Sequence, residues 1–80
     1  MKIEIKEIEG KLQYLLPIKE IERIRLKKFI NPPDFVKQLD ISLRNYYRLL
    51  KNPYTIQVKT ANSINKFIKN MEEDVRQDKF

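Results

Sequence analysis

The chain of 80 residues carries 17 lysine and arginine residues against 11 aspartate and glutamate residues, so its net charge is +6. It is long enough for one domain with one modest core, and it contains no histidine and no cysteine. These absences exclude thiol catalysis, imidazole general-base chemistry, disulfides and the commonest zinc sites.

No apolar run approaches the roughly 20 residues that a membrane span needs. The first ten residues, MKIEIKEIEG, alternate charged residues with isoleucine and do not resemble a signal peptide. We therefore expect a cytoplasmic protein with no membrane partner.

The positive charge is concentrated in the middle of the chain. Residues 1–18 are neutral, residues 19–69 hold 12 basic and 4 acidic side chains, and residues 70–80 are mildly acidic. A basic middle segment indicates a surface that binds a polyanion. A lysine-rich surface without a specific partner is the competing interpretation.

Residues 1–16 predict an N-terminal β-hairpin or extension. Apolar side chains alternate with polar ones on both sides of Gly10, the only glycine of the chain. A helix is the alternative, because some of these positions also have helical spacing: Ile5, Ile8, Leu12 and Leu15. An isolated hairpin is marginal in water, so it must pack on the helices or on a second copy of itself.

Residues 17–71 predict a helical domain. Apolar side chains recur at helical spacing from Ile18 to Ile30, and Pro32 and Pro33 are expected to end this first helix. A short second helix over about 33–39 follows, with Asn31 as its candidate N-cap. Its expected buried side chains are Phe35, Val36 and Leu39.

A turn and a third helix come next. Asp40 can adopt the left-handed backbone conformation of the turn, and Ser42 is the expected N-cap of a helix to about Lys51. Asn52 and Pro53 end that helix, and a loop runs through Val58.

The last predicted helix follows this loop. Thr60 is its candidate cap, and residues 72–80 are expected to form a polar C-terminal tail. The apolar stripe of the helix consists of Ala61, Ile64, Phe67, Ile68 and Met71.

The second and third helices have the spacing of a helix-turn-helix unit. On the third helix, positions i, i+3, i+4 and i+7 share one face and carry Arg44, Tyr47, Arg48 and Lys51. Tyr46, Leu49 and Leu50 point the other way, so Tyr46 is expected in the core and Tyr47 at the surface.

A basic outward helix face suits the DNA major groove. The arginine guanidinium can grip the O6 and N7 atoms of guanine together. Ser42 and Leu43, at the helix start, would lie deepest, although Leu43 is equally consistent with a half-buried core position. Candidate contacts to the phosphate backbone of DNA are Lys28, Lys37 and Lys59. For each of these lysines, a solvated side chain without a partner is the competing interpretation.

Residues 24–68 resemble the phage Cro and lambda-repressor-like helix-turn-helix family, also called the xenobiotic-response-element family. The most specific part is FVKQLDISLRNYYRLLKNPYT. The resemblance implies a mainly α fold, a lambda-repressor-like bundle of four to five helices, with the hairpin added at the N-terminus. It implies base contacts from Ser42, Leu43, Arg44, Tyr47 and Arg48.

Phosphate contacts follow from the same resemblance. The resemblance assigns phosphate contacts to Lys37, Asn52 and Tyr54. Further candidates, chosen for their charge, are Lys28, Lys51 and Lys59. Three departures stand against the family pattern: Asp40 replaces a glycine in the turn, Val36 replaces an alanine, and prolines replace the usual phosphate-clamping glutamine. The hairpin is also outside the common five-helix pattern.

The sequence thus predicts a sequence-specific double-stranded DNA-binding transcriptional regulator, a repressor from a phage or mobile element. It would act as a homodimer that occupies a palindromic operator. The alternative is a protein-interaction module on the same scaffold that inhibits a regulator, a polymerase or a host defence protein. Candidate dimer surfaces are the hairpin and the C-terminal helix, the latter through Phe67, Met71, Val75 and Phe80.

No enzyme is expected. Asp34 and Asp40 flank one short helix, but no second carboxylate pair, histidine or glycine-rich phosphate loop accompanies them. The acidic cluster of Glu72, Glu73 and Asp74 is expected to be a solvated tail, with metal binding as the alternative. We therefore expect no catalytic residues, no cofactor, no metal and no small-molecule ligand.

Overall fold

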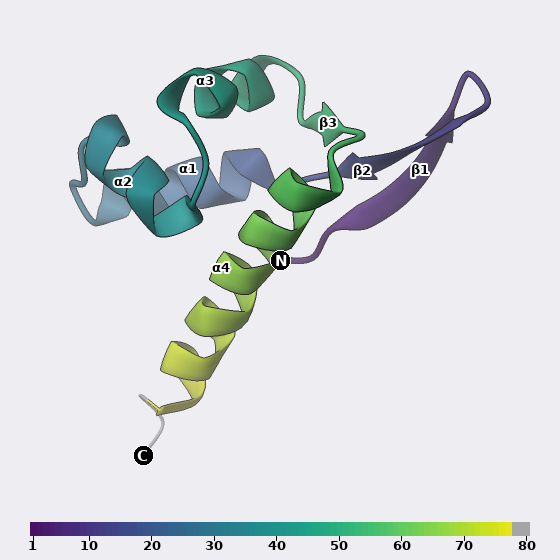
Figure 1. Cartoon of the computed structure of the whole chain (residues 1–80). Coiled ribbons are helices and arrows are strands. Elements are labelled where there is room, and N and C mark those ends of the chain that lie inside the picture. Colours follow the sequence, from purple (N-terminus) through teal and green to yellow (C-terminus); the bar gives the residue numbers. More distant parts are fainter. Residues whose placement is uncertain (78–80) are drawn as a thin grey trace.

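Within residues 1–77, four helices and a three-stranded antiparallel sheet make up a mainly helical fold (Figure 1). The structure is a computed structural model that describes the backbone of these residues and the side chains of residues 1–72. The expected fold class is confirmed at this level, with its N-terminal hairpin.

The chain begins with a β-hairpin of strands β1 (Glu4–Ile8) and β2 (Lys11–Leu15). The register places Ile5 opposite Tyr14. Glu9 and Gly10 form the two-residue turn, with φ angles of 51° and 77°. Positive φ at both positions is the requirement of a type I′ turn, and glycine meets it without a steric cost. The hairpin prediction is confirmed, and the helical alternative for this segment is wrong.

A third strand, β3 (Tyr54–Thr55), extends the sheet where the sequence predicted only a loop. It pairs antiparallel with β2, Tyr14 opposite Thr55. The Leu16 N–H donates to the Pro53 carbonyl at 2.9 Å. These bonds attach the hairpin to the segment between the third and fourth helices.

The helices that follow are α1 (Ile18–Lys27), α2 (Pro32–Leu39), α3 (Leu43–Lys51) and α4 (Val58–Gln77). In Figure 1, α1, α2 and α3 gather around the first half of α4, whose second half extends away from them. Their shared core consists of Leu16, Ile18, Ile21, Phe35, Val36, Leu39, Tyr46, Leu49, Ala61, Ile64, Phe67 and Ile68. The expected buried faces of α2 and α4 are confirmed.

Phe35 lies at the centre of this core. Its ring meets Tyr46 edge-on at 6.0 Å and Phe67 edge-on at 5.7 Å, both measured between ring centroids. Edge-to-face pairs of this kind add about 0.5–1.5 kcal/mol beyond the buried area. One side chain of α2 therefore connects α3 to α4.

The first helix ends earlier than predicted, at Lys27, so the prolines do not end it. Phe29 has a φ of 56°, its N–H donates to the Leu26 carbonyl, and the Ile30 N–H donates to the Arg25 carbonyl. This is a Schellman motif with phenylalanine at the left-handed position that usually holds glycine. Leu26 and Phe29 are exposed, at 56% and 94%, although both are among the apolar residues that recur at helical spacing in this segment.

Two further boundaries differ from prediction. Thr60 is not a cap: α4 begins at Val58, and Thr60 lies buried in its first turn. The helix also continues through Gln77, past the boundary at residue 72 where the polar tail was expected. The side chain of Val75 and all of Phe80, named above as dimer candidates, lie outside the described residues.

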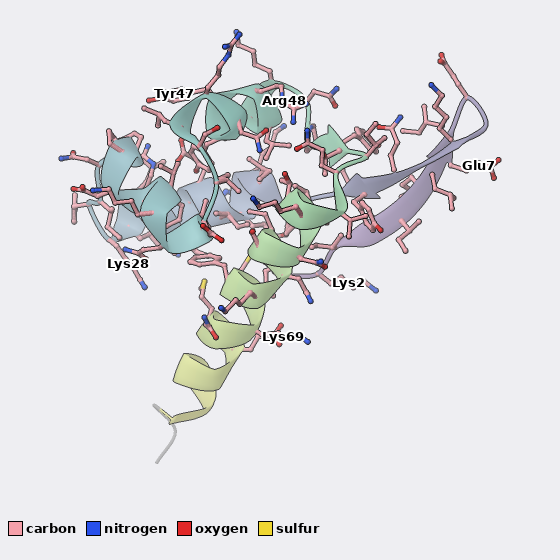
Figure 2. The ribbon with its side chains drawn as sticks, viewed as in Figure 1. Lys2, Glu7, Lys28, Tyr47, Arg48 and Lys69 are labelled. Atoms are coloured by element: carbon pink, nitrogen blue, oxygen red, sulfur yellow. The ribbon has the colours of Figure 1, made fainter. Side chains whose placement is uncertain are left out.

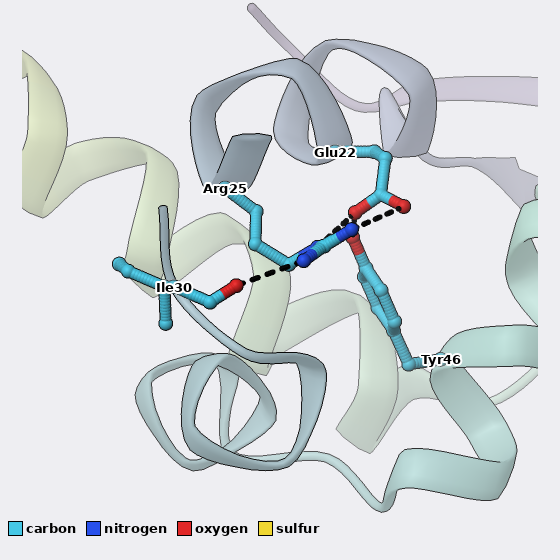
Figure 3. A network of polar contacts seen from close by, with 4 residues as sticks. All are labelled: Glu22, Arg25, Ile30 and Tyr46. Carbon is cyan, nitrogen blue, oxygen red and sulfur yellow. Dashed lines mark hydrogen bonds and ion pairs between the residues drawn. The ribbon is translucent and has the colours of Figure 1, made fainter. Parts of the chain in front are cut away.

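A polar network ties α1 to α3 and to the α1–α2 loop (Figure 3). The Arg25 guanidinium pairs with both carboxylate oxygens of Glu22 and donates to the Ile30 carbonyl at 2.8 Å. The buried Tyr46 hydroxyl donates to Glu22 at 2.7 Å. The hydrogen bond from Arg25, and then that from Tyr46, lower the pKa of Glu22 against the opposing effect of burial. Burial, then the bond to Glu22, raises the pKa of Tyr46.

Glu22→Gln tests this network through its pH dependence. A carboxyl whose pKa is lowered in the folded state stabilises the fold above its ordinary value of 4.5. That stabilisation is lost as the pH falls through the lowered folded-state pKa. We expect the variant to be less stable than the original chain by about 1–2 kcal/mol at pH 7. The difference should shrink below pH 4.5.

Urea denaturation at pH 7 and at low pH measures both quantities. Glu20→Gln is the matched control, because Glu20 is an exposed acidic residue of the same helix. An equal loss in both variants would contradict a structural role for the network.

Candidate nucleic-acid interface

The third helix begins at a side-chain cap. Ser42 has an extended backbone, and its Oγ accepts a hydrogen bond from the Asn45 N–H at 3.1 Å. This bond satisfies one of the free donors at the helix start. At the other end, Asn52 is the C-cap, and its Oδ1 accepts from the Tyr54 N–H at 3.3 Å. The predicted limits of this helix are confirmed.

The two sides of α3 have opposite environments. Tyr46 and Leu49 are fully buried, whereas Tyr47 is 48% exposed. The predicted division between the adjacent tyrosines is therefore confirmed. The side chains that share the outward face are all exposed: Arg44, Tyr47, Arg48 and Lys51.

The arginines of this face remain available to a ligand. Among the described residues, neither Arg44 nor Arg48 forms a salt bridge, and Arg44 makes no side-chain hydrogen bond. Figure 2 places Tyr47 and Arg48 on the side of α3 that faces away from α4 and Lys69. The basic side of α3 thus points outward from the fold.

Arg48 is oriented by a chain of hydrogen bonds that begins on α4. Its Nη2 donates to Asn45 Oδ1 at 2.7 Å. Asn45 Nδ2 donates in turn to Thr60 Oγ1 at 3.4 Å, and the Thr60 hydroxyl donates to Gln57 Oε1 at 2.9 Å. Only part of the guanidinium is used, so its remaining donors can still reach an acceptor outside the protein.

A polar hollow lies beside the start of α3. Its lining includes Lys37 of α2, the N-cap Ser42, Asn45 of α3 and Lys59 of α4. Asp40, whose φ of 56° confirms the predicted left-handed turn, is on the same rim. The turn therefore brings two of the predicted phosphate contacts, Lys37 and Lys59, next to the helix start.

The other predicted site residues fall into three groups. Lys51, Asn52 and Tyr54 follow one another at and after the end of α3, although the Asn52 side chain is partly engaged in its own loop. Leu43 is half-buried and packs against the core. Lys28 lies at the end of α1, and in Figure 2 it is on the side of the molecule away from the outer face of α3. The structure does not bring Lys28 together with the others.

Sequence reasoning missed Asn45 and Gln57 as site residues. Asn45 lies three residues before Arg48, a spacing at which helical side chains meet, and this was the available signal. Gln57 gave no such signal, because its bond to Thr60 depends on where α4 begins.

No family model, curated protein or solved structure matches this chain. Among the described residues, no cluster of acidic side chains could hold a metal ion, and no helix has the length and apolar character to cross a membrane.

Ser42→Ala tests the cap of α3. Loss of the Oγ acceptor should lower the free energy of unfolding by about 1 kcal/mol. Ser42→Asp keeps an acceptor at the same position and should retain most of the stability. Thermal or urea denaturation compares the three proteins, and equal stability of the alanine variant would contradict the capping role.

Proposed function

We propose that this protein is a sequence-specific double-stranded DNA-binding regulator that inserts α3 into the major groove. The observation that carries the proposal is the outward basic side of α3, whose arginines form no salt bridge with any residue whose side chain is described, opposite a fully buried side. Burial of Tyr46 and Leu49 fixes the rotation of the helix, so Arg44, Tyr47 and Arg48 are presented together.

Base recognition is assigned to the start and outer face of α3. Arg44 and Arg48 are one helical turn apart and each carries the planar donor fork that guanine O6 and N7 accept. Arg48 is already oriented by Asn45, which reduces the side-chain entropy lost on binding. Ser42 and Tyr47 offer hydroxyls on either side, and Leu43, packed against the core, contributes at most the part of its surface that remains exposed.

Phosphate contacts are assigned to the basic residues that surround this face. Lys37 and Lys59 lie beside the start of α3, and Lys51 lies at its end, followed by Asn52 and Tyr54. Contacts at both ends of a helix would fix its register along the groove. Lys28, which was also a sequence candidate, is not needed in this arrangement.

The regulator would act by occupancy. A homodimer would cover a palindromic operator with half-sites about one helical turn apart and exclude polymerase from the promoter. The two short helices and the left-handed Asp40 turn support a lambda-repressor-like arrangement of α2 and α3. We extend the proposal to a repressor of a phage or mobile element, the role that the resemblance of residues 24–68 implies.

The salt dependence of binding to duplex DNA tests the proposal directly. With about four to six phosphate contacts per protomer, the logarithm of the DNA-association constant should fall against log salt with a slope of roughly −4 to −5 for each bound protomer. Titration of a labelled duplex pool by fluorescence anisotropy at several salt concentrations gives this slope. Absence of binding even at low salt would contradict DNA recognition by this surface.

Two substitutions separate base contacts from phosphate contacts. Arg44→Ala should weaken the free energy of DNA binding by about 1–3 kcal/mol and relax the sequence preference at one base position. Lys37→Ala should instead weaken binding to all DNA sequences alike. Arg23→Ala is the matched control, because Arg23 is an exposed arginine of α1. Selection of duplexes from a random pool measures the preference. If Arg44→Ala leaves both affinity and preference unchanged, α3 is not the recognition helix.

A second candidate, a protein-interaction module, is favoured by the end of α1. Leu26 and Phe29 are largely exposed there, and Phe29 occupies a left-handed conformation that glycine would adopt more easily. An unfavourable backbone conformation beside exposed apolar side chains is the observation that motivates this candidate. Under this candidate, Phe29→Gly would abolish partner binding, and the duplex selection would return no motif.

A further inference from the structure

The outer strand of the hairpin has an unpaired edge. The strand order is β1-β2-β3, so within the described residues β1 is bonded on one side only. Figure 1 shows the hairpin extending beyond the helices, with no element of the fold alongside β1. Such an edge carries free N–H and C=O groups that can pair with another strand.

One face of the same hairpin carries exposed apolar side chains beside the exposed Glu7. Ile5 and Leu12 are 65% and 70% exposed. They lie on the face of the sheet that continues into partly buried Tyr14 and buried Leu16. This row of apolar side chains is therefore buried where the hairpin meets the helices and exposed to solvent near the hairpin turn.

The backbone groups of β1 alternate between its two sides. A two-residue turn makes Ile8 and Lys11 a hydrogen-bonded pair, so the alternate residues of β1 direct their N–H and C=O groups to the free edge. Ile5 is one of these residues, with Ile3 and Glu7 on either side of it. Ile5 could therefore exchange both backbone hydrogen bonds with an identical residue.

The charges of β1 select one register for such a pairing. If Ile5 lies opposite Ile5 of an antiparallel second copy, each Glu4 lies opposite a Lys6. A shift to either neighbouring register with the same face exposed places Glu4 opposite Glu4, or Lys6 opposite Lys6. Opposite charges directly across a sheet stabilise it and like charges destabilise it, so β1 is self-complementary in only one of these three registers.

We propose that β1 is a homodimer interface at which a second copy of this chain adds its own β1 antiparallel, centred on Ile5. The two three-stranded sheets become one, and the Ile5 side chains of both copies join the Tyr14 side chains in a continuous apolar row. The interface lies apart from α3, so the proposal does not depend on DNA binding.

Charge reversal at Glu4 and Lys6 provides the test, measured by sedimentation equilibrium at about 0.15 M salt to screen the +6 charge of each chain. The original chain should dimerise. Glu4→Lys and Lys6→Glu should each weaken the dimer roughly 10-fold or more, because both opposed pairs become repulsive. A mixture of the two variants should form heterodimers, and the double variant E4K/K6E should recover the original affinity.

Lys11→Glu is the matched control for Lys6→Glu, because it makes the same change of charge at an exposed residue of β2, away from the free edge. It should leave the dimer unchanged. Circular dichroism of each variant shows that it is folded, and the mixture provides an internal check because both components must be folded to associate. A monomeric original chain, or a dimer unaffected by either single variant, would overturn the proposal and direct attention to α4.

Discussion

The rotation of α3 about its own axis is the constraint on which the candidate interface depends. Tyr46 sets that rotation, because its ring packs edge-on against Phe35 and its hydroxyl donates to Glu22. With this side chain and Leu49 buried, the opposite side of the helix faces solvent, and it carries Arg44, Tyr47, Arg48 and Lys51. The basic character of the outward face is therefore a direct consequence of how the inward face is held.

Short-range patterns in the sequence predicted most of this arrangement. The 3.6-residue period separated Tyr46 from Tyr47, Ser42 was recognised as a cap, and the alternation around Gly10 indicated a hairpin. Asp40 was also correctly assigned a left-handed conformation. Each of these features depends on residues within one or two turns of one another, so local propensity was sufficient.

The features that sequence reasoning missed depend on distant or unusual choices. Strand β3 exists because two residues after α3 meet β2, a pairing that no local pattern records. The end of α1 was misplaced because phenylalanine, not glycine, occupies the left-handed position. The spacing of Asn45 and Arg48 was a local signal for their contact, but the bond that joins Asn45 to Thr60 of another helix had none. The site was therefore predictable in its exposed cations and unpredictable in the polar groups that orient them.

The position of β3 has a consequence for how the chain folds. The hairpin and the α1–α2–α3 segment are built largely from neighbours in the sequence, and contacts of that kind form rapidly. The pairing of Tyr14 with Thr55 instead encloses most of the helical segment in a loop, whose closure costs entropy before any hydrogen bond is gained. Joining the hairpin to the helices therefore carries a loop-closure cost that the local contacts within either part do not.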